Sequence, residues 1–251
     1  IENLIIEDAN ISSTTDNMHI VSGVVAGRNN GKITNCGTSG NSKITDNGVK
    51  GIFCVGIVGQ AMGEIEKSFS RTNIEISSSN TSTISVGGIT GALTEDYIKS
   101  CYNIGTISIN LNADKKVYVG GIAGIDNQKE ISNCYNVGTI NFNASCETSQ
   151  SIYIGSILGQ EIGENSRTIN CFNIGEINID ALNNTDVTNI GNIIGNCYLG
   201  NMDYCYNTGK INLINSNIQC IGQIVGRCHS CIVDNSYGLT GQIDAIGSQY
   251  N

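Results

Sequence analysis

The residues best suited to chemistry gather near the C-terminal end, at Cys228, His229 and Cys231, with Cys220 and Cys197 upstream. Thiolates and imidazoles are common zinc ligands, so this Cys-x-x-Cys pair, its histidine and an upstream cysteine could hold a metal ion. Structural zinc sites usually carry two Cys-x-x-Cys pairs, and this segment has one. Three interpretations therefore stay open for these side chains: free or structural thiols, a disulfide bond, or a metal site.

Cys197 and Cys228 occupy equivalent positions in consecutive copies of a sequence repeat, two residues after its closing glycine. Equivalent Cα atoms of stacked parallel strands lie about 5 Å apart, which is within the range that a disulfide accepts. If this segment holds a disulfide, we therefore expect it to join Cys197 to Cys228.

Catalytic chemistry is not expected elsewhere in the chain. A zinc peptidase requires His-Glu-x-x-His, and neither His19 nor His229 begins that motif. Glycoside hydrolysis requires two carboxylates on one face, in matching positions of adjacent repeats. We therefore predict no catalytic residue and no cofactor. Three acidic pairs have no carboxylate at the matching position of the next repeat, and we expect them to be solvent-exposed. They are Glu64 and Glu66, Glu161 and Glu164, and Glu176 and Asp180.

A repeat along the whole chain must position these residues. Residues 119–124, Val-Gly-Gly-Ile-Ala-Gly, recur with variation, and the closing glycines stand 31 to 36 residues apart. An aliphatic residue precedes each closing glycine by two positions, and we expect this column to fill the core. The closing glycines are Gly27, Gly59, Gly91, Gly124, Gly159, Gly195 and Gly226. The aliphatic column is Val25, Ile57, Ile89, Ile122, Ile157, Ile193 and Ile224.

A second phrase follows each first one, and residues 133–140, Asn-Cys-Tyr-Asn-Val-Gly-Thr-Ile, represent it. Its columns are cysteine (Cys36, Cys101, Cys134, Cys171, Cys205), aromatic (Tyr102, Tyr135, Phe172, Tyr206) and asparagine (Asn103, Asn136, Asn173, Asn207).

Each column suggests a structural role. The cysteines are expected to form a buried stack of free thiols, because a disulfide needs a closer Cβ approach, about 3.8 Å, than the 4.8 Å strand spacing gives. We expect the aromatic rings, Tyr135 among them, to point inward and stack on one another. The asparagines are expected to occupy left-handed turns and to link their amides from coil to coil.

Alternating apolar residues within each repeat, as in 174–179, indicate strands and not helices. The chain has no proline, which could not donate to a strand ladder, and 31 glycines suit the turns. We therefore predict an all-β fold, a right-handed parallel β-helix (β-solenoid) of about seven coils. Residues 1–18 form a lead-in strand or partial coil, and 19–251 form one solenoid domain with polar loops at 143–150 and 181–186.

Composition limits the partners. The net charge is −9 with no basic cluster, which argues against nucleic acid and anionic membranes. No run of about 18 apolar residues is present, so we predict no membrane insertion. The chain lacks an initiator methionine and a signal peptide, so we expect a mature or excised segment of a longer protein.

The pairing of residues 120–124 with residues 133–140 resembles the GLUG-type repeats of bacterial surface proteins. Similar repeats occur in the N-terminal region of IgA-specific metallopeptidases and in adhesin-like proteins. The resemblance implies an extracellular or cell-surface β-solenoid, while the peptidase motif itself is absent from this sequence.

Three functional hypotheses follow. The first is a non-catalytic structural or adhesive module that contacts protein or glycan surfaces. The second is a fibre subunit that binds its own copies through the solenoid ends, where strand edges would lack partners. The third is the substrate-presenting arm of a secreted peptidase whose catalytic domain lies outside this sequence.

Overall fold

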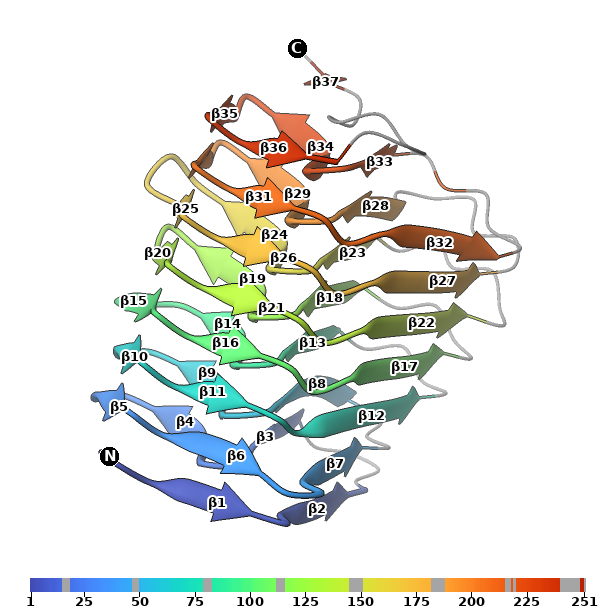
Figure 1. The fold of residues 1–251 in the computed structure, drawn as a ribbon. Helices are drawn as coiled ribbons and strands as arrows, with labels where there is room; N and C mark the ends of the chain where they lie inside the picture. Colours follow the sequence, from blue (N-terminus) through green and yellow to red (C-terminus); the bar gives the residue numbers. More distant parts are fainter. Residues whose placement is uncertain are drawn as a thin grey trace.

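The computed structural model describes residues 1–14, 19–46, 50–78, 83–111, 116–144, 151–181, 188–214, 218, 220–239 and 249–250. These residues form short strands joined by turns, and the strands stack as a right-handed parallel β-solenoid that rises from the N-terminus to the C-terminus (Figure 1). The fold class predicted from the repeat is therefore confirmed. None of the described segments forms a helix with the length and hydropathy that a membrane span requires.

The described residues form five parallel sheets along the stack, and we number them in the order in which each coil visits them. With seven or eight strands in each sheet over the described ranges, the stack is close to the seven coils that the repeat predicts. Sheet 1 contains β1 (Ile5–Glu7), β6 (Gly37–Ser39), β11 (Phe69–Ser70), β16 (Tyr102–Asn103), β21 (Tyr135–Asn136), β26 (Phe172–Asn173), β31 (Tyr206–Asn207) and β36 (Tyr237–Gly238). Sheet 2 contains β2 (Asn10–Ser13), β7 (Lys43–Asp46), β12 (Asn73–Ser78), β17 (Ile107–Leu111), β22 (Ile140–Ala144), β27 (Ile177–Ala181) and β32 (Ile211–Ile214).

The other three sheets complete each coil. Sheet 3 contains β3 (His19–Gly23), β8 (Lys50–Val55), β13 (Ile84–Gly87), β18 (Val117–Gly120), β23 (Ile152–Gly155), β28 (Thr188–Gly191) and β33 (Cys220–Gly222). Sheet 4 contains β4 (Ala26–Asn29), β9 (Val58–Ala61), β14 (Thr90–Leu93), β19 (Ala123–Asn127), β24 (Leu158–Ile162), β29 (Ile194–Tyr198), β34 (Val225–His229) and β37 (Gln249–Tyr250). Sheet 5 contains β5 (Ile33–Thr34), β10 (Ile65–Glu66), β15 (Tyr97–Lys99), β20 (Glu130–Ser132), β25 (Arg167–Ile169), β30 (Asn201–Asp203) and β35 (Ile232–Asp234).

The hydrophobic residues form two buried clusters inside the coil. One lies between sheets 2 and 3 and includes Ile74, Phe142 and Val119. The other lies between sheets 4 and 5 and includes Ile122 and Cys134. Because side chains alternate along a strand, a register shift of one residue would turn these apolar residues outward, so the core fixes the register of every coil.

The asparagine column lies at the waist between the two clusters. Asn103 is 1% exposed and the next three members are fully buried. Their backbones are not left-handed, so the predicted turn conformation was wrong. Seven left-handed residues instead stand directly before the cysteine column or its serine equivalents Ser68 and Ser236, where the chain turns out of sheet 5: Asn35, Lys67, Ser100, Asn133, Asn170, Tyr204 and Asn235.

The buried asparagines hydrogen-bond from coil to coil. The Asn103 amide donates to Asn136 Oδ1 at 2.9 Å, and Asn136 donates to Asn173 at 3.1 Å. Asn173 then donates to Asn207 at 2.9 Å. We call these four residues the inner amide ladder. Gly121 lies so close to Asn136 that a Cβ atom there would overlap the amide group, which explains a glycine at this position of the repeat.

The aromatic column faces outward, contrary to the prediction that Tyr135 points into the core. Tyr135 stands between two inward residues, Cys134 and Asn136, and neighbouring side chains on a strand point to opposite faces. The rings do stack: the centroids of Tyr102 and Tyr135 lie 4.8 Å apart with an interplanar angle of 6°. Phe172 continues the stack at 4.8 Å. Exposure increases toward the C-terminal coils, to 66% at Tyr237.

Parts of two predicted features lie outside the described residues. These are residues 145–150 and 182–186 of the expected polar loops, and residues 15–18 of the expected lead-in segment. Residues 1–14 that precede them pair in parallel with the coil above, as in Ile11 opposite Ile44, and so contribute strands to sheets 1 and 2.

Candidate functional site

One inward column of sheet 4 carries ionisable and sulfur-containing side chains in successive coils. Asp126 on β19 is in register with Glu161 on β24, Glu161 with Cys197 on β29, and Cys197 with Cys228 on β34. The equivalent position one coil earlier holds Leu93, an ordinary core residue. We call Asp126, Glu161, Cys197 and Cys228, together with Cys231, which is disulfide-bonded to Cys228, the acid–thiol row.

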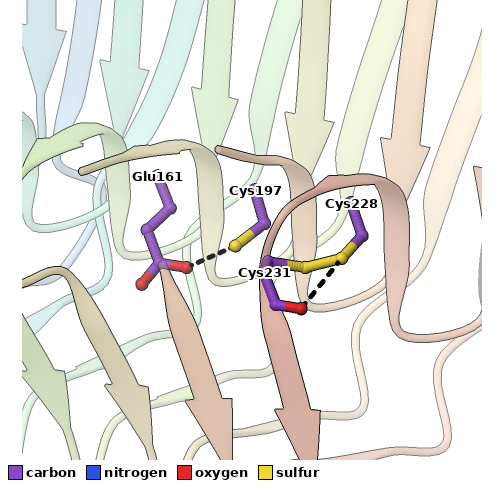
Figure 2. The surroundings of a disulfide bond; sticks show 4 residues. All are labelled: Glu161, Cys197, Cys228 and Cys231. Atoms are coloured by element: carbon purple, nitrogen blue, oxygen red, sulfur yellow. Dashed lines mark hydrogen bonds between the residues drawn. A yellow bond between two sulfur atoms is a disulfide. The ribbon is translucent and has the colours of Figure 1, made fainter. Parts of the chain in front are cut away.

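Glu161 lies at the centre of the row and is completely buried. Thr168 donates its hydroxyl hydrogen to Glu161 Oε1 at 3.2 Å. The Cys197 thiol donates to Glu161 Oε2 at 2.9 Å (Figure 2). Burial, reinforced by the negative charge of Asp126, raises the pKa of Glu161 to about 8. Near neutral pH this side chain is therefore mostly a protonated carboxylic acid.

Asp126 is the second buried acid and is 1% exposed. The backbone N–H of Lys129 donates to its Oδ2 atom at 3.3 Å, whereas Oδ1 has no hydrogen-bond partner. Burial raises the pKa of Asp126 to about 6. Two carboxyl groups on neighbouring strands of a core disfavour each other's ionisation, so the pair holds a proton more readily than exposed acids do.

Cys197 is a free, fully buried thiol. Burial and the adjacent Glu161 carboxyl group raise its pKa well above the usual range. The thiolate, which is the nucleophilic form, consequently forms only when a nearby base accepts the thiol proton. The nearest acceptor is the Glu161 carboxylate.

A disulfide closes the upper end of the row, between Cys228 and Cys231, whose Cα atoms lie 5.5 Å apart. The predicted Cys197–Cys228 pairing was therefore wrong, although these two residues are in register. Ser230, in a left-handed conformation with φ 51°, turns the chain so that Cys231 returns toward Cys228. The thiol of Cys197 points instead toward Glu161, and Figure 2 shows it between that carboxyl group and the disulfide.

The metal interpretation does not fit this arrangement. The sulfur atoms of Cys228 and Cys231 are bonded to each other, and the His229 ring stacks on Tyr198 with centroids 4.8 Å apart. Within the described part of the chain, no three histidine, cysteine or acidic side chains come together as a metal site. Cys220, the other candidate ligand, is buried on β33 in sheet 3.

The main cysteine column lies in the core between sheets 4 and 5, and its five members are buried free thiols: Cys36, Cys101, Cys134, Cys171 and Cys205. Their hydrogen bonds go to the backbone, as in the Cys101 thiol that donates to the Lys99 carbonyl at 3.3 Å. Burial raises the pKa values of Cys134 and Cys171 well above their usual range. These thiols accordingly behave as small apolar side chains. The aliphatic residues Ile122, Ile157, Ile193 and Ile224 lie in the same core.

The two acids of the row were missed by the sequence argument. Glu161 was expected to be solvent-exposed, and this expectation was wrong; the acid that matches it, Asp126, lies in the preceding repeat and not in the next one. The signal was present, because Asp126, Glu161 and Cys197 each stand two residues after a closing glycine. Counting from that glycine places all three in one inward column.

The outer face of sheet 2 is a second candidate site. Its central column runs through Ser108, Asn141, Asn178 and Asn212, which we call the outer amide ladder. Asn178 donates to Asn141 Oδ1 at 2.9 Å, and Asn212 donates to Asn178 Oδ1 at 2.8 Å. A hollow of about 350 Å³ lies on this face. Its lining includes the outer amide ladder except Asn212, together with Asn110, Asn143, Asp180 and Ile214.

A larger groove of about 520 Å³ crosses sheet 5 and the turn before it. Side chains of both charges line it, together with one aromatic ring. The lining residues are Asp96, Tyr97, Lys99, Gln128, Lys129, Glu130, Asn165 and Arg167. On the neighbouring coils, Lys32 forms ion pairs with Glu64 and Glu66, each with an N–O distance of 2.8 Å. The Tyr97 hydroxyl donates a hydrogen bond to Glu66 at 2.9 Å.

Comparisons with known proteins give no match: no protein-family model, no curated protein and no solved structure is similar to this chain. The resemblance to GLUG-type repeats therefore stays a prediction from the repeat phrases. The function has to be argued from the geometry.

Proposed function

We propose that this chain is a non-catalytic, extracellular structural module of a bacterial surface protein, and that the outer face of sheet 2 binds a glycan. The observation that carries the proposal is the outer amide ladder and the hollow that it lines. The solenoid provides a long face whose side chains repeat at about 4.8 Å, which suits contact with an extended, repeating ligand.

The chemistry of this face favours a glycan over other partners. Amide and hydroxyl side chains both donate and accept hydrogen bonds, as sugar hydroxyl groups do. Asn141, Asn178 and Asn212 are held in fixed orientations by their mutual hydrogen bonds, so little side-chain entropy is lost on binding. A hollow of about 350 Å³ lies within the usual range of small-ligand sites, roughly 300–1,000 Å³.

A glycan-binding screen with the purified chain tests this proposal. The double variant Asn141→Ala and Asn178→Ala removes the centre of the ladder, and Asn201→Ala on sheet 5 is the matched control. We expect binding to fall at least tenfold in the double variant and to stay unchanged in the control. If Tyr97→Ala and Arg167→Ala abolish binding while the double variant does not, the site is the groove on sheet 5 and the proposal is wrong.

A second candidate is a fibre formed by end-to-end stacking. Large apolar side chains are exposed on the terminal coils: Ile5 is 56% exposed on β1, and Ile232 is 59% exposed on β35. Burying such residues against a second copy would be favourable. Electron microscopy over a range of protein concentrations tests it: filaments that lengthen with concentration support the fibre, and short rods at every concentration contradict it.

A further inference from the structure

We propose that Glu161, Cys197 and the Cys228–Cys231 disulfide form an intramolecular thiol–disulfide exchange centre. The proposal rests on the order of groups along one buried column. A carboxyl group, a thiol that hydrogen-bonds to it at 2.9 Å, and a disulfide follow one another on successive strands (Figure 2). These are a base, a nucleophile and an electrophile, which is the arrangement that nucleophilic chemistry requires.

The attacked sulfur is assigned from the register. Cys197 and Cys228 are Cα partners on β29 and β34, so their Cα separation of about 4.8 Å lies within the range found for disulfides, and a local shift of less than about 1 Å brings their Cβ atoms within the accepted range of roughly 3.5–4.5 Å. Cys197 is fully buried and Cys228 is 4% exposed, so both sulfur atoms belong to the same core. Cys231 is only partly buried, and solvent can therefore stabilise it as the departing thiolate.

The exchange is balanced without an external oxidant or reductant. The Glu161 carboxylate accepts the thiol proton of Cys197, and the resulting thiolate attacks the Cys228 sulfur. The Cys197–Cys228 bond forms as the Cys228–Cys231 bond breaks. The Cys231 thiolate takes a proton from water, and Glu161 returns its proton to solvent. One thiol and one disulfide are present before and after the step.

The surrounding groups fit these roles. Thr168 donates to Glu161 Oε1 and so leaves Oε2 directed at Cys197. The Glu161 carboxyl interacts with Asp126, Cys197, Cys205 and Thr168 and lies against the backbone of Gly200, and no cation among the described residues forms an ion pair with it. Before the exchange the free thiol is the buried Cys197. After the exchange it is the partly exposed Cys231. The exchange would thus move a thiol from the core to a position that a second thiol or disulfide can reach.

Disulfide mapping tests the proposal on the intact chain, purified without reductant. The protein is incubated at pH 7 or pH 9, given a brief pulse of N-ethylmaleimide at pH 7, and digested for mass spectrometry under non-reducing conditions. We expect label on Cys231 together with a Cys197–Cys228 linked peptide. The initial rate should rise about tenfold between pH 7 and pH 9, because the ionised fraction of a base with a pKa of about 8 grows by that factor.

Two variants separate exchange from other causes of labelling. Glu161→Gln should slow labelling of Cys231 at least tenfold, while Glu164→Gln, which changes an exposed acid on the same coil, should leave it unchanged. Cys197→Ser should keep the Cys228–Cys231 bond and leave Cys231 unlabelled. Circular dichroism establishes that each variant is folded. The proposal is overturned if Cys231 of the wild-type chain stays unlabelled at pH 9, or if Cys197→Ser is labelled as fast as the wild type.

Discussion

Asp126 and Glu161 are in register on adjacent strands, and both carboxyl groups point into the core of the solenoid. Neither forms an ion pair among the described residues, so burial keeps each acid protonated to an unusually high pH. This pair makes the stability of the fold depend on pH in a direction opposite to that of a salt-bridged acid.

The pH dependence of stability is the first prediction. The pKa of Glu161 is raised from its unfolded value near 4.5 to about 8, so the folded chain holds a proton that the unfolded chain has lost. Stability is then greatest below about pH 4.5 and falls as pH rises toward 8. Asp126 adds a smaller loss between about pH 4 and pH 6. At about 1.4 kcal/mol per pKa unit, urea unfolding should show a decrease on the order of 5–8 kcal/mol across this range, the larger part from Glu161.

Glu161→Gln checks the origin of that decrease. The neutral amide keeps the size of the side chain and cannot ionise, so most of the loss between pH 6 and pH 8 should disappear. Glu164→Gln, at an exposed position of the same coil, should retain the wild-type profile. If both variants follow the wild type, Glu161 is not the group that titrates.

The second prediction separates the inner and outer columns. Ile122 is fully buried, so Ile122→Ala should lower the free energy of unfolding by about 2–5 kcal/mol through cavity formation. Tyr135 stacks on two rings outside the core, so Tyr135→Ala should cost only about 1–2 kcal/mol. Urea titration of the two variants measures both effects. Equal losses would contradict the outward placement of Tyr135.

The third prediction compares the two amide ladders. Asn136 is fully buried and hydrogen-bonds to Asn103, Asn173 and the Gly138 carbonyl, so Asn136→Ala should cost about 2–4 kcal/mol. Asn141, in the outer amide ladder, is only partly buried, and water can replace its lost partners. Asn141→Ala should therefore cost less than about 1 kcal/mol. Thermal or urea unfolding of both variants tests the contrast, and a larger loss at Asn141 would contradict it.

The sequence by itself determined the solenoid. The period of 31 to 36 residues, the alternation of apolar side chains and the glycine positions depend on local backbone geometry and on burial of one face, and both can be read along the chain. Aligning the repeats by their closing glycines also placed each aliphatic residue, and each cysteine of the main column, at the same position of its coil. Stacking of the aromatic rings also followed from the period, because equivalent residues of adjacent coils must lie side by side.

Only the tertiary structure decided which face each column occupies and which partners meet. Tyr135 and Asn136 are neighbours in sequence, and the pleat sends one outward and the other into the waist of the coil. The Cys228–Cys231 bond spans a left-handed residue, Ser230, and the equivalent Leu199 of the preceding coil is also left-handed, so the turn recurs but the cysteine pairing across it does not. Glu161 looks like a surface acid in sequence, and its burial beside Asp126 and Cys197 arises because stacking superposes residues 35 or 36 positions apart.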